Sequence, residues 1–267
     1  MNGQRADAGP VESLGGSGSR TTGADPSLGE ALDALDDGCR LLVTGDVPTD
    51  AHRVAAARYF GDPSYPRRRV LGLTHDAPRP DAWFPGGVTA AEDGAAVVRM
   101  DDPLRDPAAA SGSPAGDRGV PPDGDGTFRS RFLDAIATVA DAEDGDAVGE
   151  NGSEERGRDD GMRLRVCLFR VDGIRAALGE AAAGALLRDV TSAVGKRDGM
   201  AQFHLPRRSA ADGEGDVRSD PVVDAVVTQL ADRLDVVVEL RLRDRAVVPD
   251  ERWHIDGWGS TGWHPLG

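Results

Sequence analysis

The stretch LLVTG at residues 41–45 decides the fold, because it has the length and apolar content of a buried strand and ends in a glycine. A strand that runs into a glycine and then into a helix is how a phosphate-binding P-loop begins. The complete motif is G-x-x-x-x-G-K-[ST], in which the lysine holds phosphate and the hydroxyl holds Mg²⁺. Residues 41–45 therefore raise the question of whether the chain keeps that site.

The residues that follow Gly45 lack the chemistry of the motif. Counted from Gly45, the second glycine falls on Asp50, the lysine on Ala51 and the hydroxyl on His52. A strand and a helix without these groups indicate a nucleotide-hydrolase scaffold that has lost its catalyst. The degenerate nucleotide-binding loop comprises Gly45, Asp46, Asp50, His52 and Arg53. Arg53 supplies positive charge at the start of the helix, either as a phosphate ligand or, as we favour, as a surface residue.

Strand-like and helix-like patterns alternate along the rest of the chain. Apolar strands are expected at residues 41–45, 70–74, 164–169, 200–205 and 236–241. Helices are expected at about 50–60, from 127, over 174–190 and from 221. This alternation predicts a mainly parallel sheet covered on both faces, which is a three-layer αβα sandwich. The segments 235–242 and 252–255 are expected to add an antiparallel C-terminal hairpin.

Three polar stretches, rich in Gly, Ser, Asp and Pro, interrupt this pattern. Residues 1–26 have almost no large apolar side chain, so we expect a disordered tail. The stretches 101–126 and 142–161 have the same character and are expected to be disordered insertions. The remainder, residues 27–267, is predicted to be a single domain.

The charge balance predicts the surroundings of the protein. The chain has 46 acidic and 31 basic residues, a formal net charge of −15, and a single lysine, Lys196. Such acidity is tolerated in concentrated salt, where repulsion is screened, so we expect a halophilic protein. It argues against a nucleic-acid partner. The first residues contain no apolar signal region, and no stretch has the apolar length of a membrane span, so we expect a cytoplasmic protein that does not contact membranes.

Several strings resemble a haloarchaeal family whose members look like degenerate relatives of RecA and KaiC-type ATPases. These strings are LLVTGDVP at 41–48, LRVCL at 164–168, GMAQFHLP at 199–206, VVVELR at 236–241 and RWH at 252–254. The resemblance covers about residues 27–266, apart from the insertions. It implies a RecA-like αβα sandwich in an archaeal, salt-adapted cytoplasm. It implies no particular reaction or partner.

In active RecA-like enzymes, a second strand ends in an acidic residue that helps to hold Mg²⁺. Here the corresponding position holds Phe169, and the next carboxylate is Asp172. A residue three positions further along a strand faces the other side of the sheet, which argues against Asp172 as a metal ligand. We therefore expect no bound cofactor, no metal and no catalytic residue, and interpret the chain as a pseudo-ATPase that acts through contacts with a protein partner or with its own copies.

Two other classes of function stay open. A hydrolase or weak nucleotide-binding site would lie at the C-terminal ends of the strands, where open α/β sheets place their sites. Its candidate residues are His75, Asp76, Asp172 and His204, with Asp46 and Asp50 nearby. A pure interaction module is suggested by Trp253, Trp258 and Trp263, because tryptophan is common at interfaces. Packing of the terminal hairpin onto the sheet is the interpretation that we favour for these tryptophans.

Overall fold

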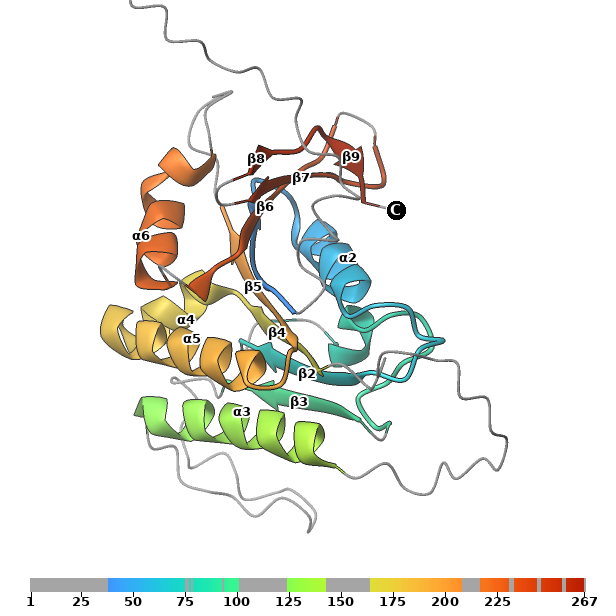
Figure 1. Ribbon diagram of the computed structural model, residues 1–267, viewed down its shortest axis with the longest axis vertical. Helices are drawn as coiled ribbons and strands as arrows, with labels where there is room; N and C mark the ends of the chain where they lie inside the picture. Colours follow the sequence, from blue (N-terminus) through green and yellow to red (C-terminus); the bar gives the residue numbers. More distant parts are fainter. Residues whose placement is uncertain are drawn as a thin grey trace, which may run out of the picture.

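The described part of the chain forms one sheet with helices on both faces (Figure 1). The computed structural model describes residues 38–74, 77, 79–92, 94–100, 124–142, 164–207, 217–230, 233–243, 246–255 and 258–266. The expected tail at 1–26 and most of the expected insertions at 101–126 and 142–161 lie outside these residues. Within the first insertion, residues 124–126 belong to a helix.

The sheet has nine strands in the order β3-β2-β4-β5-β1-β6-β7-β8, and β9 pairs with β7. They are β1 (Arg40–Gly45), β2 (Arg68–Leu73), β3 (Ala95–Arg99), β4 (Leu164–Phe169), β5 (Met200–Pro206), β6 (Val236–Arg241), β7 (Asp250–Ile255), β8 (Gly259–Ser260) and β9 (His264–Pro265). The first six strands are parallel, and β7 runs antiparallel to β6, β8 and β9. The predicted mainly parallel sheet with an antiparallel C-terminal end is confirmed.

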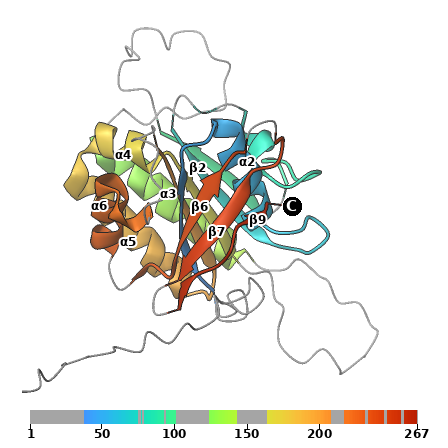
Figure 2. The same ribbon diagram turned by 90° about the horizontal axis from the view of Figure 1, so that it is seen from above.

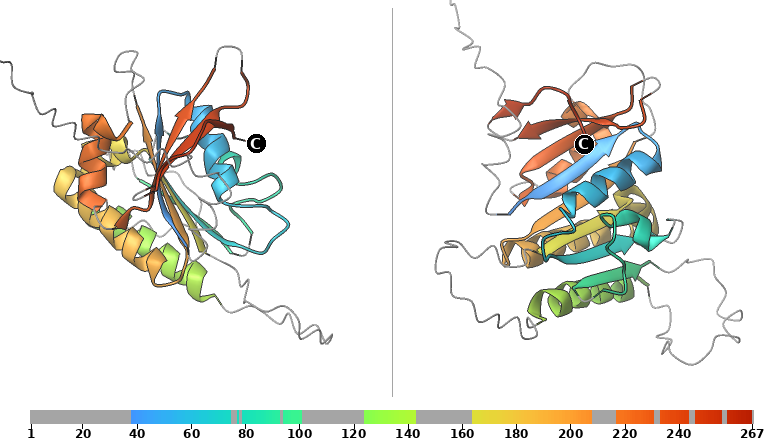
Figure 3. Two further views of the ribbon diagram at one scale, coloured as in Figure 1. Left: turned by 45° about the horizontal axis from the view of Figure 1, so that its top comes forward. Right: turned by 90° about the vertical axis from the view of Figure 1, so that its right-hand side faces the viewer.

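The helices form two layers of unequal size (Figure 3). One face of the sheet carries α2 (Thr49–Tyr59) and the short helix η1 (Pro80–Trp83). The other face carries α3 (Gly124–Asp141), α4 (Val171–Leu178), α5 (Glu180–Gly195) and α6 (Pro221–Leu230), the last preceded by the short helix η3 (Val217–Ser219). The predicted three layers are therefore present. Within the described ranges, no helix combines the length and apolar content needed to cross a membrane.

Both faces of the central strands are buried, so most of their side chains are apolar, and the buried polar exceptions include Thr44, Gln202 and His204. In β1, Leu42 packs into the core under α3 to α6, whereas Leu41 and Val43 pack into the core between α2 and the antiparallel strands. All three side chains are fully buried. Because successive residues face opposite sides of a strand, β1 supplies both cores at once and fixes the position of the loop that follows it.

The sequence predicts one helix over residues 174–190. This prediction is wrong in one respect, because two helices, α4 and α5, occupy the region. Gly179 separates α4 from α5 and has φ of +81°, a backbone conformation that glycine adopts without strain. The apolar repeat continues across the break because both helices cover the same face of the sheet. Periodicity alone therefore could not reveal the turn between them.

The antiparallel hairpin of β6 and β7 packs against α2 (Figure 2). Trp253 is buried there, with its ring edge against the ring of Tyr59 at a centroid distance of 6.2 Å. Trp263 lies under the guanidinium groups of Arg241 and Arg252, at 4.1 and 4.7 Å from the ring centroid. Trp258 is half exposed. Two of the three tryptophans thus hold the hairpin in place, as the packing interpretation predicts.

Candidate functional site

The loop between β1 and α2 is the position where a P-loop would bind phosphate. Only residues 46–48 join the end of β1 at Gly45 to the start of α2 at Thr49. Counted from Gly45, the helix thus begins one position before the second glycine of the motif. Pro48 at the N-cap makes no side-chain hydrogen bond. This connection is shorter than the loop that the motif uses to surround a phosphate.

Contacts with the neighbouring strand hold this short loop inward. Gly45 has φ of +149°, and a Cβ atom at this position would lie 2.2 Å from the backbone oxygen of Leu240 in β6. Val47 is buried in the core between α2 and the antiparallel strands, whereas Asp46 and Pro48 are exposed. Gly45 therefore serves close packing of the backbone here, rather than approach to a ligand.

His52, which occupies the hydroxyl position of the motif, points into the protein. Its side chain is fully buried, and its Nδ1 atom lies 3.2 Å from Nδ1 of His204 in β5. The centroid of its ring is 6.4 Å from that of Phe169 at the end of β4. The residue that would bind Mg²⁺ in an active enzyme is here part of the core.

The neighbours of His204 determine which ring nitrogens carry protons. The amide nitrogen of Gln202 donates to the backbone oxygen of Ala56 at 3.2 Å, so its amide oxygen faces His204 and accepts a hydrogen bond from Nε2 at 2.8 Å. In neutral His204, Nδ1 must then be the acceptor, and Nδ1 of His52 donates to it. The remaining nitrogen of His52, Nε2, is a bare acceptor that is buried without a hydrogen-bond partner among the described residues.

Both histidines are neutral at pH 7. Burial lowers the pKa of His52 from 6.5 to about 4, although the backbone of Gly45 and the charge of Asp172 oppose this shift. Burial also lowers the pKa of His204 well below its usual range, and the neighbouring His52 lowers it further. Neither ring is therefore a cation that could neutralise a phosphate.

Asp50 and Arg53 lie on the exposed side of the first turn of α2. Nε of Arg53 pairs with Oδ1 of Asp50 at 3.2 Å, and its Nη1 donates to the backbone oxygen of Ala82 in η1 at 3.3 Å. The side chain of Asp50 is 82% exposed. Arg53 thus links α2 to η1, and its charge is partly offset by the carboxylate beside it.

Asp172 lies in the first turn of α4 and not in a strand, because β4 ends at Phe169. The expectation that strand alternation turns Asp172 away is therefore wrong. Arg170, with a left-handed φ of 63°, precedes the helix and pairs with Oδ2 of Asp172 at 3.0 Å. The other carboxylate oxygen, Oδ1, is buried without a hydrogen-bond partner among the described residues.

The structure thus brings Gly45, His52, His204 and Asp172 to the same end of the sheet. His75 and Asp76, which were expected at this end, lie outside the described residues. Among the described residues, no group of three or more His, Cys, Asp or Glu side chains is arranged to hold a metal. Gln202 was not predicted as part of this site, although its position two residues before His204 places both side chains on the same face of β5.

The buried histidine pair predicts a loss of stability at mildly acidic pH. Above pH 6.5, the two rings are neutral in both the folded and the unfolded chain. Between pH 6.5 and about 4, His52 binds a proton in the unfolded chain but not in the folded chain. Stability should therefore fall as the pH falls through this window, by up to about 1.4 kcal/mol per pH unit for each histidine. Urea unfolding at a series of pH values measures this slope.

The matched variant for this measurement is His52→Gln, which removes one titrating group and keeps an amide donor for His204. Its pH slope in the same window should be smaller than that of the unmodified chain, since only His204 of the pair still titrates. An unchanged slope would show that other groups cause the acid sensitivity.

No curated protein matches the sequence. Among solved structures, a KaiC-like protein of the hyperthermophilic archaeon Pyrococcus horikoshii is similar to this chain, with a TM-score of 0.46 and 10% sequence identity over 85% of this chain and 84% of that chain. A protein-family model, described as a family of unknown function (DUF7504), matches residues 38–240 and so covers more than half of the chain. This protein belongs to the DUF7504 family.

Proposed function

We propose that this protein is a non-catalytic RecA-like protein, a pseudo-ATPase that acts through protein contacts in a regulatory role. One observation carries the proposal: His52, at the position of the Mg²⁺-binding hydroxyl, is buried and bonded to His204. A ligand at this site would meet neutral rings that are already engaged inside the core. Mg²⁺ also prefers hard oxygen ligands to imidazole.

The neighbouring positions support the same conclusion. Ala51, at the lysine position, is buried in the core between α2 and the antiparallel strands. Phe169, at the expected acidic position, is buried with its ring centroid 4.1 Å from that of Trp83. Removing one preorganised charge-stabilising group from an active site costs about 3 kcal/mol in the barrier, and here several such groups are replaced together.

The setting of the proposed role is a halophilic, archaeal cytoplasm. The support is compositional: 46 acidic residues, 31 basic residues and a single lysine. The partner in this proposal is another protein or a second copy of this chain. Light scattering in molar potassium chloride measures the molar mass and so distinguishes a chain that self-associates from a monomer that binds a different protein.

A second candidate function is a hydrolase or a weak nucleotide-binding ATPase at the C-terminal strand ends. Asp172 favours it, because Oδ1 of its carboxylate is buried without a hydrogen-bond partner among the described residues. The charge of Asp172 also raises the pKa of His52, against the larger effect of burial. A carboxylate in this position could complete a cation site if substrate phosphates supplied further ligands.

Nucleotide hydrolysis separates the two candidates. In molar potassium chloride, the purified protein should hydrolyse neither ATP nor GTP above the rate measured without protein. Its melting temperature should not respond to millimolar Mg-ATP, since a ligand at about 100 times its Kd adds about 2.7 kcal/mol of stability. A rise of several degrees would contradict the absence of binding.

The control for this experiment is Arg53→Ala, compared with Arg79→Ala at an exposed arginine for which no ion pair with another described residue is found. If a rise with Mg-ATP disappears only in Arg53→Ala, Arg53 replaces the missing lysine and the second candidate function gains support. Hydrolysis that is lost in Asp172→Asn would overturn the non-catalytic proposal.

A further inference from the structure

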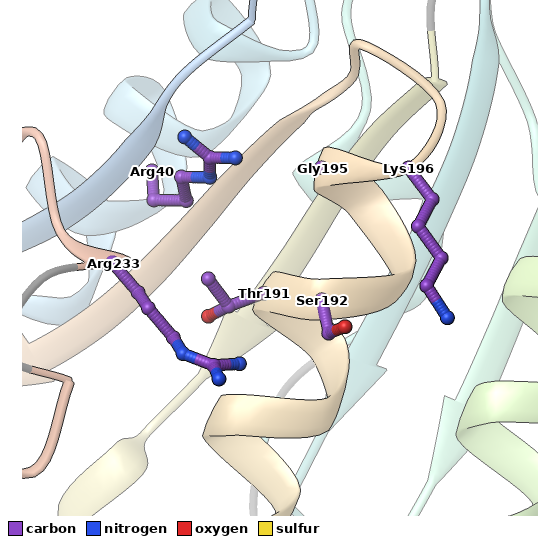
Figure 4. Close-up of a pocket in the computed structure, with 6 residues that line it drawn as sticks. All are labelled: Arg40, Thr191, Ser192, Gly195, Lys196 and Arg233. Atoms are coloured by element: carbon purple, nitrogen blue, oxygen red, sulfur yellow. The ribbon is translucent and has the colours of Figure 1, made fainter.

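A pocket of about 340 Å³ lies at the opposite end of the sheet from the loop that follows β1 (Figure 4). It is formed by the first residue of β1, the last turn of α5 and the segment before β6. The lining residues are Arg40, Thr191, Ser192, Gly195, Lys196 and Arg233. The proposed function does not involve this end of the sheet.

The lining of the pocket is cationic, although the chain as a whole is strongly acidic. Arg40, Lys196 and Arg233 carry positive charge, the hydroxyl of Ser192 adds a donor, and no carboxylate is among the lining residues. Lys196 is the only lysine in a chain with a formal net charge of −15. The concentration of cations here is therefore local and opposes the overall composition, as expected for a site that attracts an anion.

Arg40 is held in place at the edge of the pocket by Asp235. Oδ2 of Asp235 accepts hydrogen bonds from the backbone nitrogen of Arg40 at 2.7 Å and from its Nη1 at 3.3 Å. Nε of Arg40 is buried without a hydrogen-bond partner among the described residues. Asp235 thus fixes the guanidinium group of Arg40 at the edge of the pocket, and phosphate or carboxylate oxygens are the partners that a guanidinium group fits best.

Gly195 gives Arg40 the space for this position. A Cβ atom on Gly195 would lie 2.5 Å from Nη2 of Arg40. Gly195 ends α5 and is not among the glycines with positive φ, so its backbone conformation does not require glycine. Because alanine forms helices better than glycine, the small residue is explained by the guanidinium group that lies against it.

A purely structural role for these cations would be to bind the last carbonyl groups of α5. Arg197, which does not line the pocket, already does this, because its Nη1 donates to the backbone oxygen of Ala193 at 3.2 Å. Arg233 donates from Nη1 to the backbone oxygen of Arg188 at 3.3 Å, and its other guanidinium nitrogens have no hydrogen bond to another described residue. No ion pair between Lys196 and another described residue is found.

We propose that this pocket is a binding site for a phosphate-bearing small molecule. A phosphate dianion matches two guanidinium groups better than a carboxylate does, because it offers more charge and more acceptor oxygens. The guanidinium group of Arg233 and the hydroxyl of Ser192 donate to the phosphate oxygens, and Arg40 adds positive charge beside them. Lys196 lies at the edge of the pocket, and its side chain extends away from Arg40 and Arg233 (Figure 4).

Isothermal titration calorimetry of the full chain in molar potassium chloride tests this site, with inorganic phosphate, ribose 5-phosphate and acetate as probes. Phosphate should bind saturably and acetate should not. Arg233→Ala should weaken phosphate binding about tenfold, because it removes a charge-assisted contact. Tighter binding of ribose 5-phosphate than of phosphate identifies an organic phosphomonoester as the ligand, and equal binding identifies free phosphate.

Gly195→Ala is the decisive variant. It should weaken phosphate binding by displacing Arg40, without lowering the melting temperature of the ligand-free protein, since alanine favours the helix. Ser192→Ala provides a milder second variant if Gly195→Ala folds poorly, and should weaken binding about threefold. Arg79→Ala, on the face of the sheet that carries α2, is the charge-matched control and should bind phosphate as the unmodified chain does.

Three results would overturn the proposal: no saturable phosphate binding, acetate binding as tight as phosphate binding, or equal weakening in Arg79→Ala and Arg233→Ala. The same variants separate this site from the degenerate P-loop. A melting-temperature rise with ATP that disappears in Arg233→Ala and persists in Arg53→Ala places the nucleotide phosphates in this pocket and leaves the non-catalytic proposal intact.

Discussion

Restoring the P-loop motif with Asp50→Gly, Ala51→Lys and His52→Thr is expected to destabilise the protein strongly and to produce no nucleotide hydrolysis. Ala51 is only 6% exposed and packs between α2 and the antiparallel strands, so a lysine there must bury its charge or force the helix away. Threonine at position 52 leaves Nδ1 of His204 without its donor and leaves a cavity in place of the ring. The combined loss should be at least about 4 kcal/mol, a large fraction of the stability of a typical domain.

Urea unfolding in molar potassium chloride measures this loss, and Asp50→Gly alone is the matched control. Asp50 is exposed in the first turn of α2, so its replacement by glycine should cost only about 1 kcal/mol. If the triple variant were as stable as this control, the burial of His52 and Ala51 would not be what excludes the motif. Nucleotide hydrolysis by the triple variant would show that another carboxylate, such as Asp172, already holds a metal.

Replacement of Gly45 by alanine is expected to be the most damaging change of a single methyl group. The added Cβ would lie 2.2 Å from the backbone oxygen of Leu240, and backbone atoms cannot rotate away as a side chain can. The φ of +149° adds strain for any residue other than glycine. We expect a loss of about 3 kcal/mol or more, because β1 and β6 must separate at this point.

Gly86→Ala is the control for this prediction, since its Cβ would have no heavy atom within 4 Å and its φ is not positive. It should change the stability by less than about 0.5 kcal/mol. Both variants are compared by urea unfolding at the same salt concentration. Equal stability of Gly45→Ala and Gly86→Ala would mean that the loop after β1 can move away from β6, and that a ligand could open it.

The strands and their order along the chain followed from local pattern. The stretches predicted at 164–169 and 236–241 coincide with β4 and β6, and that at 41–45 differs from β1 by one residue. A strand buried on both faces is mostly apolar, and strands that alternate with helices favour parallel pairing; both patterns can be read from the sequence. The break at Gly179 could not be read in this way, because a glycine within an apolar repeat does not reveal its φ.

The loss of the motif residues was likewise visible in the sequence, as Asp50, Ala51 and His52 stand where glycine, lysine and a hydroxyl are required. The contacts that the replacing residues make could not be predicted from the sequence. His52 and His204 are 152 residues apart and meet because β5 lies beside β1 and places His204 under α2. Strand neighbours that are distant in the chain depend on the packing of the whole sheet, which local pattern does not encode.

The cationic pocket likewise combines a feature that the sequence shows with a feature that only the fold shows. The sequence by itself determined that the chain is acidic, with one lysine and with arginines spread along its length. Only the tertiary structure places Arg40, Lys196 and Arg233 around one cavity, because they come from β1, from the residue after α5 and from the segment before β6. Local pattern determined the elements and the missing catalyst, because both depend on neighbours in the chain. Packing decided the buried histidine pair and the cationic pocket, because both depend on elements that are distant in the chain.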